Sequence, residues 1–217
     1  ALKVEWDTSA VGKPDSTALL AQYRELATKP GLVAMHADMA PLAGAAHKIS
    51  AEFVFPYLAH APMEPLNCTI QLDGDKAELW MGTQMPGLDA MAAAKTLGLP
   101  PQNIKVHTQM AGGGFGRRAI PSSDYVVEAC GVAKAVRTAG ISAPVRTLWS
   151  REDDIKGGYY RPMHVHRAEI GFDAQGNILA WDHVIVGQSI TQGTPFEGMM
   201  VKAIQNPGTE CPVLRMD

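Results

Sequence analysis

The sequence predicts an α+β fold, with mixed sheets and helices mainly on one face. Segments in which apolar residues alternate, as they do in strands, are interleaved with segments in which they recur every three or four residues, as in helices. Turn signals at Asp73-Gly74-Asp75 and at residues 173–176 separate neighbouring strand-like segments as hairpins. The resulting order, β-β-α-β-α-β-α-β-β, is that of an α+β domain rather than of a regular parallel sheet.

The first elements lie in a weakly patterned region. Alternating residues 2–6 predict a short strand, and Asp15-Ser16-Thr17 predicts the start of a helix that ends at Pro30. A connector over residues 31–46 follows. The alternating run from His47 to Ala59 predicts a strand, with Pro56 near its end.

The middle of the chain has the clearest pattern. Residues 67–72 and 76–81 predict a hairpin, and Pro86-Gly87 begins a predicted helix that ends at Gly98. A strand is expected over residues 103–108. A long helix over residues 122–138 is expected to be capped by Ser122 or Ser123.

The last third predicts a strand over residues 144–149, a short helix capped by Ser150, and a hairpin of residues 161–172 and 177–189. His164 and His166 have the spacing of metal ligands on one strand face. Because the sequence offers no third ligand, we interpret them as ordinary strand histidines and predict no metal-ligating residue.

Composition narrows the function classes. The chain is 46% hydrophobic and 19% charged, with a net charge of −3, which gives no electrostatic reason to bind nucleic acid or an anionic membrane. It contains no apolar run of about 18 residues, the length needed to span a bilayer. Its three cysteines are isolated, so the sequence predicts neither an iron–sulfur cluster nor structural zinc here. The compartment is not indicated.

The sequence is organised around the glycine-rich stretch Met110–Arg118. Glycine permits backbone angles closed to other residues and lets another group approach the main chain closely. Phe115 lies between Gly114 and Gly116, so neighbouring side chains cannot shield its ring. Gln84 also follows a predicted strand, and its neutral amide donates hydrogen bonds without adding charge.

Three interpretations of this stretch are open from the residues alone. One is an ordinary strand-to-helix turn with the Phe115 ring folded back into the core. Another is a phosphate-binding module in which Arg117 and Arg118 act as clamps, although neither the dinucleotide fingerprint nor the Walker motif is complete here.

A separate question concerns His60 and Glu64, which lie on a proline-flanked loop. They could form an acid–base pair or a structural pair that shapes the loop.

The third interpretation is a resemblance. Residues 109–118, Gln-Met-Ala-Gly-Gly-Gly-Phe-Gly-Arg-Arg, resemble the cofactor loop of the molybdenum hydroxylases, the xanthine dehydrogenase/aldehyde oxidase superfamily. Gly82-Thr83-Gln84 resembles the Thr-Gln segment of that family, and residues 60–65 resemble its His-x-x-Leu-Glu-Pro segment. The sequences of residues 57–67 and 111–118 are most similar to those of the isoquinoline 1-oxidoreductase β-subunit branch. The resemblance covers residues 1 to about 190.

The resemblance implies a molybdopterin-binding-domain-like fold and a molybdenum–molybdopterin cofactor in the full subunit, in the cytosine dinucleotide form of bacterial relatives. It implies that Gln84 approaches the apical oxo ligand and that Phe115 lies beside the substrate. Gln84 and Phe115 would be the catalytic residues, and both would also bind the cofactor. Gly113, Gly114, Gly116 and Arg117 would complete the set of cofactor-binding residues.

The resemblance also implies the reaction and the partners. Water-derived oxygen would be added to an electron-poor carbon of an N-heterocyclic aromatic such as isoquinoline, and electrons would leave through iron–sulfur clusters on a small partner subunit. Ala119 stands where xanthine-oxidising members have an acidic residue, which argues against a purine substrate. The alternatives are a membrane-associated aldehyde dehydrogenase large subunit of the same superfamily, and a non-catalytic scaffold.

The resemblance finally predicts that the chain is a piece of a larger subunit. Residues 1–46 would be the tail of an upstream domain plus a linking helix with an apolar face unpartnered in this chain. Residues 47–190 would be the first part of the molybdopterin-binding domain, and 191–217 a loosely ordered tail. The family's catalytic glutamate belongs to a downstream segment missing here, so we expect the isolated chain to be inactive. The expected location is the cytoplasmic or periplasmic face of a bacterial inner membrane.

Overall fold

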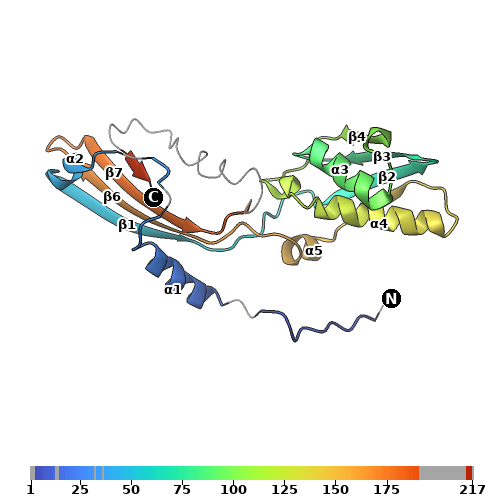
Figure 1. The fold of residues 1–217 in the computed structure, drawn as a ribbon, viewed down its shortest axis with the longest axis horizontal. Helices are drawn as coiled ribbons and strands as arrows, with labels where there is room; N and C mark the ends of the chain where they lie inside the picture. The colour runs from blue at the N-terminus through green and yellow to red at the C-terminus, as the bar shows by residue number, and fades with distance from the viewer. Residues whose placement is uncertain (1–2, 13–14, 32, 36, 191–213, 217) are drawn as a thin grey trace. The chain divides into compact units, whose positions relative to one another are not determined.

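A computed structural model describes all residues except 1–2, 13–14, 32, 36, 191–213 and 217. The chain divides into two compact units, one of residues 1–56 with 162–217 and one of residues 57–161. Each unit has a four-stranded sheet of its own (Figure 1). The mixed sheets confirm the predicted α+β class.

The unit of residues 57–161 is built on a sheet of order β4-β3-β2-β5. Its strands are β2 (Asn67–Asp73), β3 (Lys76–Met81), β4 (Ile104–Thr108) and β5 (Val145–Leu148). β2 and β3 form the predicted hairpin, with Leu72 opposite Ala77. β3 and β4 run parallel, so both strands end at the same edge of the sheet. The segments that follow them therefore begin at that edge.

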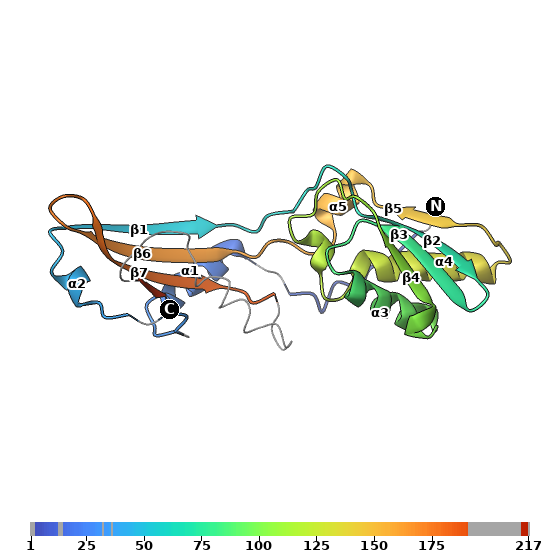
Figure 2. The same cartoon turned by 90° about the horizontal axis from the view of Figure 1, so that it is seen from above.

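Two helices, α3 (Pro86–Leu97) and α4 (Asp124–Thr138), lie on one face of this sheet (Figure 2). The core between them is apolar and includes Leu79, Met81 and Val126, each at most 1% exposed. Burial raises the pKa of the core thiols of Cys68 and Cys130 to about 12, so both behave as small apolar side chains. α5 (Arg151–Lys156) completes the unit, and Ser150 caps it as predicted by accepting from the Asp153 N–H.

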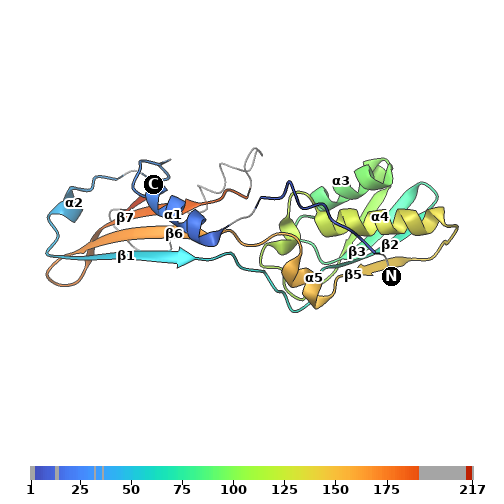
Figure 3. The ribbon, with the colours of Figure 1, turned by 90° about the horizontal axis from the view of Figure 1, so that it is seen from below.

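The second sheet has the order β1-β6-β7-β8 and consists of β1 (His47–Phe55), β6 (His164–Phe172), β7 (Ile178–Gly187) and β8 (Leu214–Met216). Two helices belong to this unit, α1 (Ser16–Leu26) and α2 (Ala40–Ala43). α1 packs against β6 and β7, with Tyr23 buried beside Met163 and Val165 (Figure 3). The Glu52 carboxylate also joins Arg24 of α1 to Arg167 of β6.

Three expectations require comment. The apolar face of α1 was expected to lack a partner in this chain; this is wrong, because Leu19, Leu20 and Tyr23 pack on the sheet. Residues 3–6 form no strand, since no described strand pairs with them. The division into residues 1–46, 47–190 and 191–217 stays a prediction, and most of the expected loose tail lies outside the described residues.

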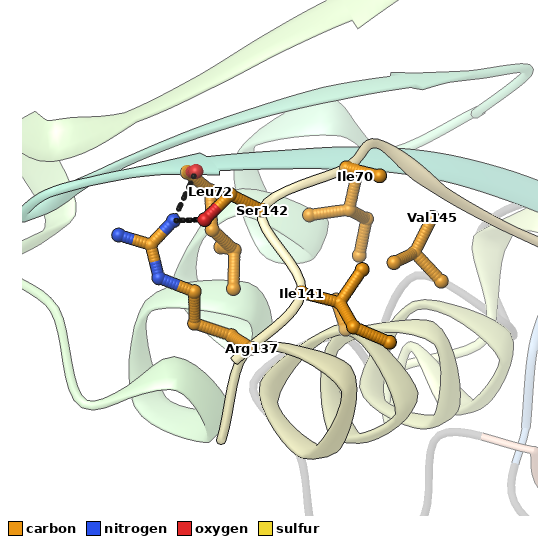
Figure 4. Close-up of a pocket in the computed structure, with 8 residues that line it drawn as sticks. Ile70, Leu72, Arg137, Ile141, Ser142 and Val145 are labelled. Carbon is orange, nitrogen blue, oxygen red and sulfur yellow. Dashed lines mark hydrogen bonds between the residues drawn. The ribbon is translucent and has the colours of Figure 1, made fainter. Parts of the chain in front are cut away.

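A small pocket lies between β2, β5 and the C-terminal part of α4 (Figure 4). Its lining includes Ile70, Ile141 and Val145, and Arg137 donates to the Leu72 carbonyl at 3.2 Å. Since α4 has 15 residues and rises about 1.5 Å per residue, its two ends are about 20 Å apart. The glycine-rich stretch precedes the other end of α4, so this pocket is not part of the candidate site.

Candidate functional site

Three segments of the unit 57–161 meet beyond the ends of β3 and β4. The Glu64 N–H donates to the Gly112 carbonyl at 3.0 Å, and the Gln84 N–H donates to the Arg118 carbonyl at 3.2 Å. The proline-flanked loop, the Gly82-Thr83-Gln84 segment and the glycine-rich stretch are therefore joined through their main chains. The structure brings together the segments that the sequence placed at separate strand ends.

Two glycines in the stretch are required by these close approaches. A Cβ at Gly112 would lie 2.6 Å from the Glu64 Cβ, and one at Gly114 would lie 2.7 Å from the Gln84 Oε1. Real Cβ atoms do not approach other atoms so closely, so a side chain at either position forces a shift. Gly112 thus fixes how tightly the glycine-rich stretch packs on the proline-flanked loop, whereas a Cβ at Gly114 would displace the tip of the Gln84 side chain.

Phe115 is held away from the core. Its φ is +55°, a left-handed conformation that disfavours an L-residue by about 1–2 kcal/mol. Its side chain is 73% exposed, so the ring is not folded back into the interior. An exposed aromatic ring on strained backbone contributes little to folding, and such strain is concentrated at functional sites.

The glycine-rich stretch also leaves main-chain donors unused. Among the described residues, the N–H groups of Gly113, Gly114, Phe115 and Gly116 make no hydrogen bond. Positive φ values at Gly113, Phe115 and Gly116 are typical of the loops in which successive N–H groups form an anion-binding nest. Gln84 lies beside them: its Oε1 accepts from the Arg118 N–H at 3.2 Å, and its Nε2 has no described partner. Five neutral donors are therefore available together.

Arg117 was predicted as a cofactor ligand, with a solvated surface position as the alternative. Its side chain is 2% exposed and forms a two-pronged ion pair with Asp124, at 2.9 and 2.7 Å. The guanidinium also lies over the Trp149 ring, 5.4 Å from its centroid, and over the Tyr159 ring at 5.8 Å. It is not a surface arginine, and its role as a ligand stays a prediction.

Glu64 has the structural role rather than the acid–base one. Its Oε2 accepts from the Gly112 N–H and its Oε1 from the Asn67 Nδ2, both at 2.6 Å. Burial acts to raise the pKa of Glu64, but these two hydrogen bonds and the Arg118 charge outweigh it and lower that pKa. A carboxylate so engaged is a poor proton acceptor. No hydrogen bond joins it to His60 among the described contacts.

Comparison with known proteins matches residues 28–207 to the family model for the molybdopterin cofactor-binding domain. That match covers most of the 217 residues. The chain belongs to this family.

Relatives of this molybdopterin-binding domain are much longer proteins. The chain is 37% identical over 131 residues to the isoquinoline 1-oxidoreductase subunit beta of Brevundimonas diminuta. This match covers 59% of the chain and 16% of that protein. The chain is 32% identical over 151 residues to the molybdenum-binding subunit of the Escherichia coli K12 aldehyde oxidoreductase. This match covers 70% of the chain and 20% of that protein. The solved structure of quinoline 2-oxidoreductase of Pseudomonas putida 86 shares the fold, with a TM-score of 0.63 and 21% sequence identity. The similarity covers 87% of this chain and 25% of that one.

The donors of this molybdopterin-binding domain suit the cofactor that its family binds. A pterin with phosphate and metal oxygen atoms presents hydrogen-bond acceptors, and the four unpaired N–H groups and the Gln84 Nε2 are all neutral donors. Gly116 has nothing within 4 Å of an added Cβ, so its main chain is open to close approach. The residues present therefore fit a molybdopterin group, which these donors would hold at the glycine-rich stretch.

Sequence reasoning missed a second layer behind Gln84 in this molybdopterin-binding domain. The Thr83 hydroxyl donates to the Asp89 carboxylate and accepts from the Met85 N–H, which fixes the turn that presents Gln84. Asp89 is 2% exposed, and burial raises the pKa of its carboxyl. A Thr-x-x-x-x-x-Asp spacing across a helix start gives little signal by itself, so only the fold reveals this pair.

Neither membrane-spanning nor metal-ligating groups occur in the part of the molybdopterin-binding domain that the structure describes. None of its described helices is long and apolar enough to cross a bilayer. Within the same residues, no group of three or more His, Cys, Asp and Glu side chains is arranged to hold a metal ion.

His164 and His166 lie together on β6. The His166 Nδ1 is 3.1 Å from the Nε2 of His183 on the neighbouring strand β7. Burial, followed by the charges of His183 and His164, lowers the pKa of His166 to about 4. Because the unfolded pKa is about 6.5, the unfolded chain binds more protons between these values. The free energy of unfolding should therefore fall as pH is lowered from about 6.5 to about 4. Urea titrations of His166→Phe should show a shallower fall than wild type; identical slopes would contradict the assignment.

Proposed function

We propose that this domain is the cofactor-facing part of the molybdenum subunit of an oxidoreductase that hydroxylates an N-heterocyclic aromatic, as isoquinoline 1-oxidoreductase does. One observation carries the proposal: four unpaired N–H groups lie next to an exposed Phe115 ring and the free Nε2 of Gln84. When bound, the molybdenum–pterin group supplies two-electron oxidation of carbon with oxygen taken from water. The chain's own residues bind the cofactor and orient the substrate.

Each residue has a distinct part in the proposed site. The N–H groups of residues 113–116 hold acceptor atoms of the cofactor, in the cytosine dinucleotide form expected of bacterial relatives. Gln84 donates a neutral hydrogen bond, which stabilises developing negative charge without a counter-charge. The Phe115 ring offers a flat apolar face to a flat substrate. The iron–sulfur clusters are proposed to lie on a small partner subunit, as the resemblance implies; the three isolated cysteines of this chain form no cluster motif.

The 37% identity to an isoquinoline 1-oxidoreductase subunit and the small Ala119 support an N-heterocycle over a purine. The 32% identity to an aldehyde oxidoreductase subunit supports aldehyde oxidation as the second candidate. The chain matches 16% to 26% of the length of such relatives, so we further propose that the isolated 217 residues are inactive. Turnover by this chain alone would contradict that.

Metal and pterin analysis of the complete subunit with its partner tests the proposal. We expect about one molybdenum and one pterin per subunit, and faster turnover of isoquinoline than of an aromatic aldehyde. In water labelled with ¹⁸O, the hydroxylated product should acquire the label from water. Absence of both molybdenum and pterin would instead identify a non-catalytic scaffold, and preference for the aldehyde would favour the second candidate.

A further inference from the structure

Arg118 is the least accessible charged side chain near the candidate site. The residue is 1% exposed, and its side chain is fully buried. Burying a guanidinium is unfavourable unless its donors are satisfied and its charge is balanced. Its neighbour Arg117 balances its charge with a carboxylate, Asp124. Arg118 instead satisfies its donors with main-chain carbonyls.

The three carbonyls that Arg118 contacts come from three different segments. Its Nε donates to the Gly113 carbonyl at 2.9 Å, its Nη1 to the Gly82 carbonyl at 3.2 Å, and its Nη2 to the Glu64 carbonyl at 3.1 Å. The Glu64 Oε2, 3.5 Å from Nη2, balances the charge. The three carbonyls belong to the glycine-rich stretch, to the segment that carries Gln84 and to the proline-flanked loop.

The main chain of Arg118 adds two further links. Its N–H donates to the Gln84 Oε1 and its carbonyl accepts from the Gln84 N–H, each at 3.2 Å. One residue thus determines both where the Gln84 backbone lies and which way its carboxamide turns. A guanidinium presents its donors in a fixed planar fork, whereas a lysine ammonium is a single point and cannot reach three separated carbonyls.

We propose that Arg118 is the positioning residue of the site: a buried cation that holds the segments of Glu64, Gln84 and Gly113 in the arrangement a bound cofactor requires. Because its side chain is fully buried, it acts through Gln84 and the glycine-rich stretch rather than by direct contact with a ligand. Its catalytic consequence rests on the proposed function. Its effect on the three segments does not, and can be measured on this chain by itself.

Amide hydrogen exchange followed by NMR tests the proposal on the 217-residue chain. In Arg118→Met, the amides of Gly112 and Gln84 should exchange at least tenfold faster than in wild type, while core amides of α4 such as Ala129 change less than twofold. Arg117→Met is the matched control, because it removes an equally buried arginine that contacts none of the three carbonyls. It should leave Gly112 and Gln84 protected.

Wild-type exchange at Gly112 and Gln84 in a folded Arg118→Met chain would overturn the proposal, as would equal loosening in the Arg117→Met control. If Arg118→Met does not fold, Arg118→Lys decides: intermediate exchange at the two amides supports positioning, and unchanged exchange refutes it. In the complete enzyme, Arg118→Lys should lower kcat per bound molybdenum at least tenfold with KM changed less than threefold. A wild-type enzyme without molybdenum would refute the proposed function and leave the exchange result standing.

Discussion

Replacing Gln84 with alanine in the complete enzyme should lower kcat by about 10²- to 10³-fold, the usual effect of removing one donor aimed at developing negative charge. The structure shows how the Gln84 carboxamide is oriented. The Oε1 of Gln84 is engaged by the Arg118 N–H, which leaves the Nε2 oriented and without a described partner. The loss should appear in kcat measured per bound molybdenum, with isoquinoline as substrate.

Two further variants separate the donor from the structure around it. Gln84→Glu keeps an oxygen for the Arg118 N–H but removes the donor, so it should be as inactive as the alanine variant. Gln109→Ala removes a neighbouring exposed carboxamide that donates only to the His107 carbonyl, and should retain activity within about twofold. The unfolding free energy of Gln84→Ala should change by about 1 kcal/mol or less, as expected for one hydrogen bond. A kcat within threefold of wild type would exclude the proposed role.

Local patterns were sufficient to predict the elements that support the site. The Asp-Gly-Asp turn predicts the β2–β3 hairpin, and Pro86 and Gly98 mark the beginning and end of α3. These signals act over a few residues, where backbone preference and hydrophobic period determine the outcome. The helix start at Ser123 shows the limit of such rules: the residue lies at the N-cap position, but its φ of +48° prevents ordinary capping and its hydroxyl makes no capping bond.

Long-range contacts were not predictable from those patterns. His47 pairs with Phe172, which makes β1 part of a separate sheet, and nothing near either residue specifies that pairing. The burial of Arg117 and Arg118 is a similar case, because two adjacent arginines after a glycine-rich stretch look like surface residues. Their partners, Asp124 and the carbonyls of three segments, are provided only by the fold. The sequence predicted which residues form the candidate site, and the structure adds the side chains that hold them in place.

Gly112→Ala should disrupt the packing of the glycine-rich stretch on the proline-flanked loop. The new Cβ would lie 2.6 Å from the Glu64 Cβ and 3.2 Å from its Oε2, so the two segments must separate. That separation also breaks the bond from the Gly112 N–H to Glu64. Overpacking of this kind costs about 1–3 kcal/mol. Urea unfolding of the chain should show a loss in that range, and the complete enzyme should retain less than a tenth of its molybdenum.

Gly131→Ala provides the matched control, because Gly131 lies in α4 with no other atom within 4 Å of its added Cβ. That variant should gain up to about 1 kcal/mol from better helix propensity and keep its full molybdenum content. Comparing the two alanines isolates the contact with Glu64 from the general effect of replacing glycine. If Gly112→Ala retained wild-type stability and molybdenum, close packing between the glycine-rich stretch and the proline-flanked loop would not be what shapes the site.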